Sequence, residues 1–122
     1  MKENNVILDK SFQFGLRIVK LFRYLREKKI ERELCIQLLK SGTSIGANVE
    51  EAVGGTTKRD FIFKLSIAYK EARETRYWLR IFRESRFIDD KLAVSFIGDC
   101  EELIKILTVI LNSSKQQDNG KL

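Results

Sequence analysis

Residues 41–52 have the sequence Ser-Gly-Thr-Ser-Ile-Gly-Ala-Asn-Val-Glu-Glu-Ala, which places two glycines inside an otherwise amphipathic helical pattern. An interior glycine destabilises a helix by about 1 kcal/mol relative to alanine, so a compensating interaction is expected. Gly42 and Gly46 share one helix face, where small residues let another helix backbone approach closely. The alternative, a phosphate-binding loop, lacks the Gly-Lys-Ser/Thr ending and a preceding strand. We therefore expect a helix-packing site.

The composition favours a single all-α domain. The chain has 122 residues, no proline, 7 glycines and 33% charged residues, which suits long helices better than a turn-rich β fold. Its apolar runs are far shorter than the roughly 20 residues needed to cross a bilayer, and residues 1–5 lack a signal-peptide pattern. We therefore expect a cytoplasmic protein that does not span a membrane.

Apolar residues recur at helical spacing in four segments, which predicts helices over residues 11–28, 33–53, 58–84 and 90–112. The third segment has the clearest signal, a four-three repeat typical of a helix buried along one seam. This seam consists of Phe61, Leu65, Ala68, Ala72, Thr75, Leu79 and Phe82. The predicted organisation is an N-terminal arm over 1–9, a four-helix bundle over 10–112 and a disordered tail over 113–122, which has little to bury.

Local signals set the expected helix ends. Gly54 and Gly55 follow the second helix, where paired glycines commonly end a last turn. Thr57 with an acidic residue three positions later resembles a capping box for the third helix. Asp89 and Asp90 can cap the fourth helix and complement its dipole.

The third and fourth helices have more apolar surface than a monomeric bundle needs. Phe63 and Trp78 lie beside the seam of the third helix, and Ile97 and Ile104 lie beside that of the fourth. A second apolar flank that includes a tryptophan favours a subunit interface.

The net charge of +6 is unevenly distributed along the chain. Residues 1–48 and 57–86 carry +5 each, whereas residues 49–56 and 87–122 carry −2 each. Such a balance attracts polyanions such as RNA without implying sequence recognition. The candidate nucleic-acid-binding residues form two helical stripes, Arg17, Lys20, Arg23 and Arg26 in one and Arg73, Arg76, Arg80 and Arg83 in the other.

Each stripe has alternative interpretations. The first is either a solvated face or a polyanion-binding strip. The second is a solvated face, a set of pairs with acids such as Glu50 and Glu51 of another helix or subunit, or a set of phosphate contacts. Arginine suits the last two because its planar fork pairs with carboxylate and with phosphate.

Catalytic chemistry has little support in the sequence. The chain has no histidine, which removes the Glu-x-x-His pairs of di-iron bundles and His-based activation of a nucleophile. Cys35 and Cys100 fall on apolar seams, where inert buried thiols are expected rather than a disulfide. The remaining candidate metal ligands are Glu50, Glu51, Glu71 and Glu74. Neighbouring arginines would neutralise them, so we expect no enzyme activity, cofactor, metal or small-molecule substrate.

Two motifs, residues 41–52 and the run Lys-Glu-Ala-Arg-Glu-Thr-Arg-Tyr-Trp-Leu over 70–79, resemble a known family. They are similar to the four-helix-bundle proteins encoded in intervening sequences of bacterial 23S rRNA genes, over about residues 10–112. A relation to the accessory variability determinant of diversity-generating retroelements is also implied. The resemblance implies an antiparallel up-down-up-down bundle that assembles as a homopentamer and has no established catalytic residues. It implies packing and assembly roles for Ser41, Gly42, Ile45, Gly46, Asn48, Glu51 and Trp78.

The expected function is therefore non-catalytic. The sequence predicts an oligomeric bundle that binds RNA or a ribonucleoprotein through its basic surface, with an association with rRNA as the expected setting. The alternative is a structural adaptor pentamer that binds a protein partner such as a reverse transcriptase.

Overall fold

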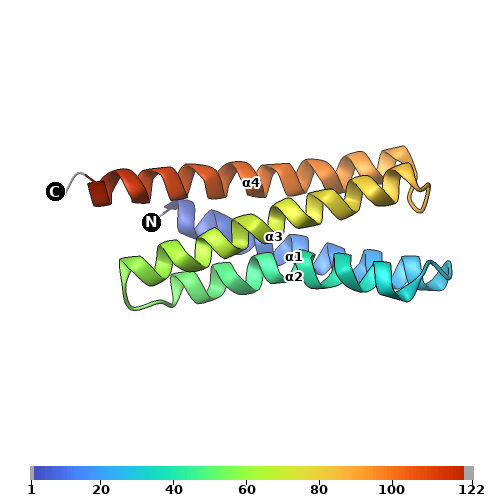
Figure 1. Cartoon of the computed structure of the whole chain (residues 1–122), viewed down its shortest axis with the longest axis horizontal. Helices are drawn as coiled ribbons and strands as arrows, with labels where there is room; N and C mark the ends of the chain where they lie inside the picture. The colour runs from blue at the N-terminus through green and yellow to red at the C-terminus, as the bar shows by residue number, and fades with distance from the viewer. Residues whose placement is uncertain (1, 120–122) are drawn as a thin grey trace.

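Four helices in antiparallel order form the bundle in the computed structural model, which describes residues 2–119, with side chains described over 4–115 (Figure 1). They are α1 (Lys2–Glu27), α2 (Arg32–Val53), α3 (Lys58–Glu84) and α4 (Asp90–Asn119). Residues 2–119 contain no strand. The predicted all-α four-helix bundle is therefore confirmed.

The core lies along the seams that the apolar spacing predicts. Every seam position from Leu65 to Phe82 in α3 is buried, and Phe61 packs half-buried against the core. The corresponding positions of α2 and α4 are also buried, among them Cys35, Val49 and Leu107. The spacing of apolar residues thus determines which face of each helix points inward.

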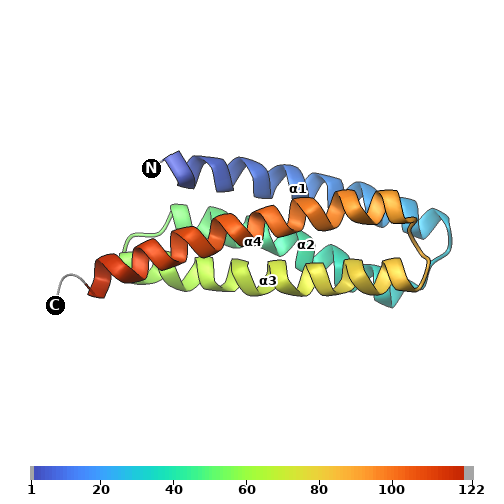
Figure 2. The same ribbon diagram turned by 90° about the horizontal axis from the view of Figure 1, so that it is seen from above.

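The bundle is least closed between its first and last helices. α1 packs on α2, α2 on α3 and α3 on α4, whereas α1 makes fewer contacts with α4 than any of these pairs make. α1 and α4 are inclined to each other in both views (Figure 2).

The two glycines of α2 mark the close approach of α1. A Cβ on Gly42 would lie 2.8 Å from two side-chain carbons of Ile18, and a Cβ on Gly46 would lie 3.2 Å from the backbone oxygen of Ser11. A contact of 2.8 Å is essentially never made by a real Cβ, so alanine at Gly42 would force Ile18 to shift. The 3.2 Å contact at Gly46 is tighter than most real ones, so alanine there would press on the backbone of α1. Both glycines therefore face α1 at close range.

The ends of the outer helices differ from the prediction. The proposed N-terminal arm is helical from Lys2, and Ile7 is buried because residues 7, 11, 14 and 18 continue the inward face of α1. The proposed disordered tail is helical over 113–119, and Ser114 is buried on the same face as Leu107 and Leu111. Residues 1 and 120–122 lie outside the described residues.

Both connections at one end of the bundle contain a non-glycine residue in the left-handed region. Lys29 has φ 63° after α1, and Arg86 has φ 64° after α3. Each is followed by a residue whose N–H reaches back into the preceding helix, Ile30 to Leu25 at 3.1 Å and Phe87 to Phe82 at 2.9 Å. In this bonding pattern the left-handed residue is the second one after the last helical residue, and it ends the helix.

The other predicted helix ends are confirmed in position. α2 ends at Val53, although Gly54 is right-handed, with φ −80°. The Thr57 hydroxyl accepts a hydrogen bond from the Asp60 N–H at 3.0 Å and caps α3. The Asp89 carboxylate accepts one from the Leu92 N–H at 2.8 Å and caps α4.

Candidate nucleic-acid interface

The basic stripe of α1 divides into fixed and unpaired cations. Arg17 donates to Asp99 at 2.6 Å and to Ser95 at 3.1 Å, both on α4, and its guanidinium lies 4.0 Å from the ring centre of Phe96. Arg26 donates to the Ile30 carbonyl at 2.5 Å, which fixes its position and leaves its charge in place. The other two members, Lys20 and Arg23, are exposed and contact no acid among the described side chains.

The stripe of α3 divides in the same way. Arg76 pairs with Glu101 at 2.9 Å and Arg83 with Asp90 at 3.0 Å, whereas Arg73 lies 6.0 Å from the ring centre of Tyr69. Arg80 is exposed and has no acidic partner over the described part of the chain. Two arginines of α3, Arg76 and Arg83, therefore pair with acids, and both acids belong to α4.

Glu50 and Glu51 of α2, the acids named as candidate partners, do not pair with the arginines of α3. Glu51 pairs with Lys64 at 2.7 Å, and Glu50 is exposed. The arginines pair instead with acids of α4, because the bundle places α4 beside both α1 and α3. Glu102 of α4 likewise pairs with Lys10 of α1 at 3.2 Å. The middle of the bundle is thereby largely neutralised.

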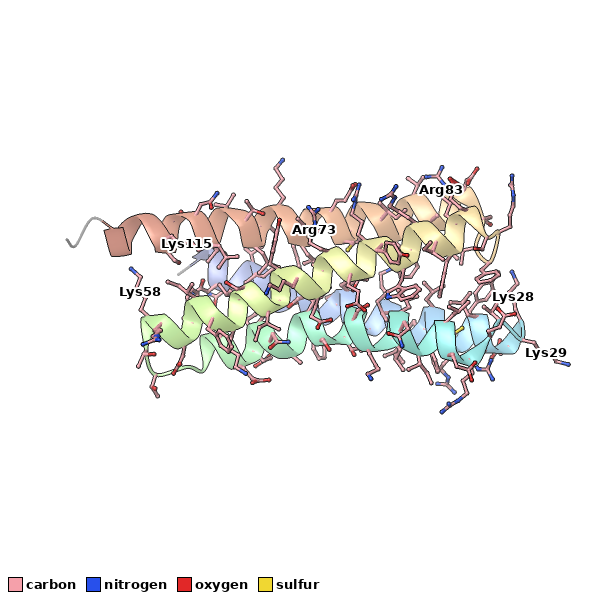
Figure 3. All side chains as sticks on the ribbon, in the orientation of Figure 1. Lys28, Lys29, Lys58, Arg73, Arg83 and Lys115 are labelled. Atoms are coloured by element: carbon pink, nitrogen blue, oxygen red, sulfur yellow. The ribbon has the colours of Figure 1, made fainter. Side chains whose placement is uncertain are left out.

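The positive charge that remains is concentrated at one end. The connections α1–α2 and α3–α4 lie together at this end (Figure 1). Residues 20–33 and 80–91, which we call the basic end, hold 10 Lys/Arg against 6 Asp/Glu, or +4 of the total +6. Figure 3 shows Lys28, Lys29 and Arg83 at this end, with Lys58 and Lys115 towards the opposite end. The candidate interface is thus an end of the bundle and not a pair of stripes along it.

Most cations of the basic end are available to a ligand. Seven of them have side chains with no hydrogen-bond or ion-pair partner among the described residues: Lys20, Arg23, Lys29, Arg32, Arg80, Arg86 and Lys91. Lys28 donates to the Phe87 carbonyl at 3.3 Å and lies 5.1 Å from the ring centre of Tyr24, contacts that do not neutralise it. Unpaired Lys and Arg side chains are the groups that displace counterions from a phosphate backbone.

Two hollows beside these cations each contain an exposed tyrosine. A groove of about 640 Å³ between α1 and α4 includes Tyr24, Lys20 and Lys91 in its lining. A smaller hollow of about 220 Å³ on α3 is lined by Tyr77 and Arg80 among others. Sequence reasoning missed Tyr24, Tyr77 and Lys91. The available signal was the interleaving of tyrosines with arginines near the ends of the first and third helices.

The predicted packing residues lie as follows. Ile45 is fully buried, and the Ser41 and Thr75 hydroxyls meet at 3.0 Å between α2 and α3. Asn48 donates to the Ser44 carbonyl at 2.8 Å within its own helix. Trp78 is half-buried against the core, and its ring N–H donates to Glu74 at 3.1 Å.

The titratable groups with displaced pKa values are structural. Burial raises the pKa of the Cys100 thiol to about 12, and this thiol donates to the Ala72 carbonyl at 3.2 Å. Burial likewise raises the pKa of Cys35, so both free thiols are protonated at neutral pH. Burial, and then the charge of Glu74, raise the pKa of Glu71.

Within the described residues, no group of three or more potential metal ligands comes together.

The fold and the site together define a small antiparallel four-helix bundle with a basic end. None of its helices, within residues 2–119, combines the length and hydropathy that a membrane span requires. The family model described as "23S rRNA-intervening sequence protein" matches residues 3–109. The chain belongs to this family, as its two sequence motifs indicated.

A solved structure supports the assignment. The chain is 42% identical to a protein of unknown function from the S23 ribosomal protein family of Bacteroides thetaiotaomicron, known from a crystal structure. The similarity covers 90% of this chain and 98% of that one, with a TM-score of 0.88. No curated protein matches the chain.

Proposed function

We propose that the protein is a non-catalytic, cytoplasmic homopentamer that binds RNA or a ribonucleoprotein through the basic end. The observation that carries the proposal is the concentration of +4 charge on residues 20–33 and 80–91, beside a middle section whose arginines are paired. The family's description makes 23S rRNA the first RNA to test.

Apolar surface on α1 supports the assembly part of the proposal. Phe12, Leu16 and Val19 follow one another at helical spacing and are 58%, 46% and 40% exposed. They border a hollow of about 290 Å³ that also reaches Gly15 and Gly46. An exposed apolar row beside small residues is suited to a helix of a second copy. Five copies would repeat the basic end five times, so weak contacts would act together.

Salt dependence of RNA binding tests the binding part. Affinity for a structured 23S rRNA fragment, measured by fluorescence anisotropy, is expected to fall more than roughly tenfold between 50 and 200 mM KCl because binding releases counterions. The double variant Lys20→Gln/Arg23→Gln should bind more weakly and with a shallower slope. Its matched control, Lys70→Gln/Lys105→Gln, removes two exposed cations outside the basic end and should have the smaller effect. A flat salt response would refute the proposal.

A second candidate is the structural adaptor, favoured by the pairing of Arg17, Arg76 and Arg83 with acids of the same chain. In this case the assembly presents a surface to a protein such as a reverse transcriptase. The double variant Arg80→Gln/Arg83→Gln separates the two functions. Loss of RNA affinity at unchanged mass supports RNA binding, whereas dissociation of the oligomer without loss of RNA affinity supports the adaptor.

A further inference from the structure

We propose that the groove between α1 and α4 at the basic end binds an unpaired RNA base, with Tyr24 as the stacking surface and Lys20 and Lys91 as phosphate contacts. The inference rests on the proposed RNA binding and specifies the form of RNA that this site takes.

The groove has a size and lining that suit a nucleotide. Its volume of about 640 Å³ lies within the range of roughly 300–1,000 Å³ common for small-ligand sites. Leu21, Leu92 and Phe96 supply apolar lining from both helices. Tyr24 remains 43% exposed, so part of its ring is open to a ligand. Base–aromatic stacking is the common means by which proteins hold unpaired nucleotides.

The charges around the groove favour an anion. Lys20 on α1 and Lys91 on α4 stand on its two sides, are exposed, and have no acidic partner in the described part of the chain. Asp89 is the one acid in the lining, and its carboxylate is already bonded to the Leu92 N–H. Arg17 also lines the groove but is paired with Asp99, so Lys20 and Lys91 against Asp89 leave the lining with +1.

Fixed side chains hold the groove open in a defined shape. The Arg17 guanidinium is bonded to Asp99 and Ser95 and lies over Phe96, so it forms a rigid wall. The exposed Lys28 ammonium lies 5.1 Å from the ring centre of Tyr24 and is bonded to a backbone carbonyl, so it adds an unneutralised positive charge beside the ring. A preformed site loses little entropy on binding.

The aromatic ring distinguishes unpaired from paired RNA. Bases within a duplex are stacked on one another and cannot reach a ring inside a groove, whereas rim lysines can contact the phosphates of either form. An acidic peptide would satisfy the lysines but would not use the tyrosine ring as a stacking surface. Loss of that ring should therefore affect single-stranded RNA selectively.

The test compares two RNA probes and two variants of the full chain. A 12-nucleotide oligouridylate and a blunt 12-base-pair RNA duplex are titrated with wild type, Tyr24→Ala and the control Tyr24→Phe, which keeps the ring. Tyr24→Ala should lose roughly 5- to 150-fold in affinity for the oligouridylate and little for the duplex. Tyr24→Phe should retain both affinities. Circular dichroism and light scattering confirm that each variant keeps its fold and mass.

The possible failures are distinguishable. If wild type binds neither RNA, the proposed RNA binding fails and this inference fails with it. If the duplex binds and the oligouridylate does not, or if Tyr24→Ala affects both equally, RNA binding stands and the stacking site is refuted. If Tyr24→Ala changes the mass of the assembly, the groove binds a second copy of the chain. If an acidic peptide displaces the oligouridylate and Tyr24→Ala has no effect, the groove binds a protein partner. Either result overturns the inference.

Discussion

Gly42 determines how closely α1 approaches α2, and its replacement tests the packing directly. We predict that Gly42→Ala lowers the free energy of unfolding by up to about 2 kcal/mol, because overpacking costs about 1–3 kcal/mol and the higher helix propensity of alanine offsets about 1 kcal/mol of this cost. Ile18 cannot yield easily because it is fully buried. Urea denaturation measures the change.

The matched control is Gly98→Ala in α4, where an added Cβ meets nothing within 4 Å. This substitution should stabilise the protein by about 0.5–1 kcal/mol through helix propensity alone. A gain of stability in Gly42→Ala equal to that of Gly98→Ala would contradict the close approach.

Arg86 has φ 64°, a conformation that suits glycine better than arginine. Arg86→Gly is therefore expected to raise the free energy of unfolding by about 1 kcal/mol. Arg86→Ala removes the same charge but keeps a side chain that disfavours the left-handed backbone conformation, so it should not raise the free energy of unfolding. Thermal denaturation of the two variants side by side separates the backbone effect from the electrostatic one.

The Cys100 thiol predicts a pH dependence of stability. Its pKa is raised by burial from 9.0 to about 12, so between these values the folded state binds more protons than the unfolded state. The stabilising contribution is complete below pH 9 and is lost as pH rises towards 12. Urea denaturation at pH 8 and 10 should show a steeper loss for wild type than for Cys100→Ala. Equal slopes would show that this thiol is not the cause.

At the scale of the helices, apolar spacing predicted the inward faces but not the lengths. The seams of α2, α3 and α4 were predictable because a buried face requires a regular repeat. The start of α1 was missed because the apolar run Val6-Ile7-Leu8 is too short to show a helical repeat, although Ile7 is buried in the core. The end of α4 was missed because the residue buried there, Ser114, is polar and has polar neighbours. Local composition contains no information on such tertiary contacts.

The pairing of the two stripes with α4 was also beyond sequence reasoning. Asp99 and Glu101 have the spacing of a solvated face, and only the bundle topology places them beside Arg17 and Arg76. For the same reason the candidate site moved to the end of the bundle, where acids of the neighbouring helix do not balance the cations.

The acids of α4 therefore control how much positive charge is available. Asp99→Asn combined with Glu101→Gln should change the free energy of unfolding by less than about 1 kcal/mol, because both ion pairs are about half-exposed. The same double variant should raise RNA affinity, since it adds +2 and releases two arginines. Anisotropy titration at 100 mM KCl tests this, and a fall in affinity would contradict the neutralising role of α4.

At the scale of the whole molecule, the exposed row on α1 predicts self-association. Leu16→Glu should lower the mass of the wild-type assembly, expected near five times 14.2 kDa, towards that of one chain. Multi-angle light scattering measures it. Val109→Glu, a charge at a 55% exposed valine of α4, is the control and should leave the mass unchanged. A wild-type mass near 14.2 kDa would remove the pentamer and the multivalent binding it supports.

The first turn of α1 and the last turn of α4 both lie at the end of the bundle opposite to Lys28 and Arg83 (Figures 1 and 3). A fluorescent label or a biotin handle fused before α1 or after α4 would therefore extend away from the lysine- and arginine-rich surface. A chain immobilised through either handle would present that surface outward to RNA in a flow cell.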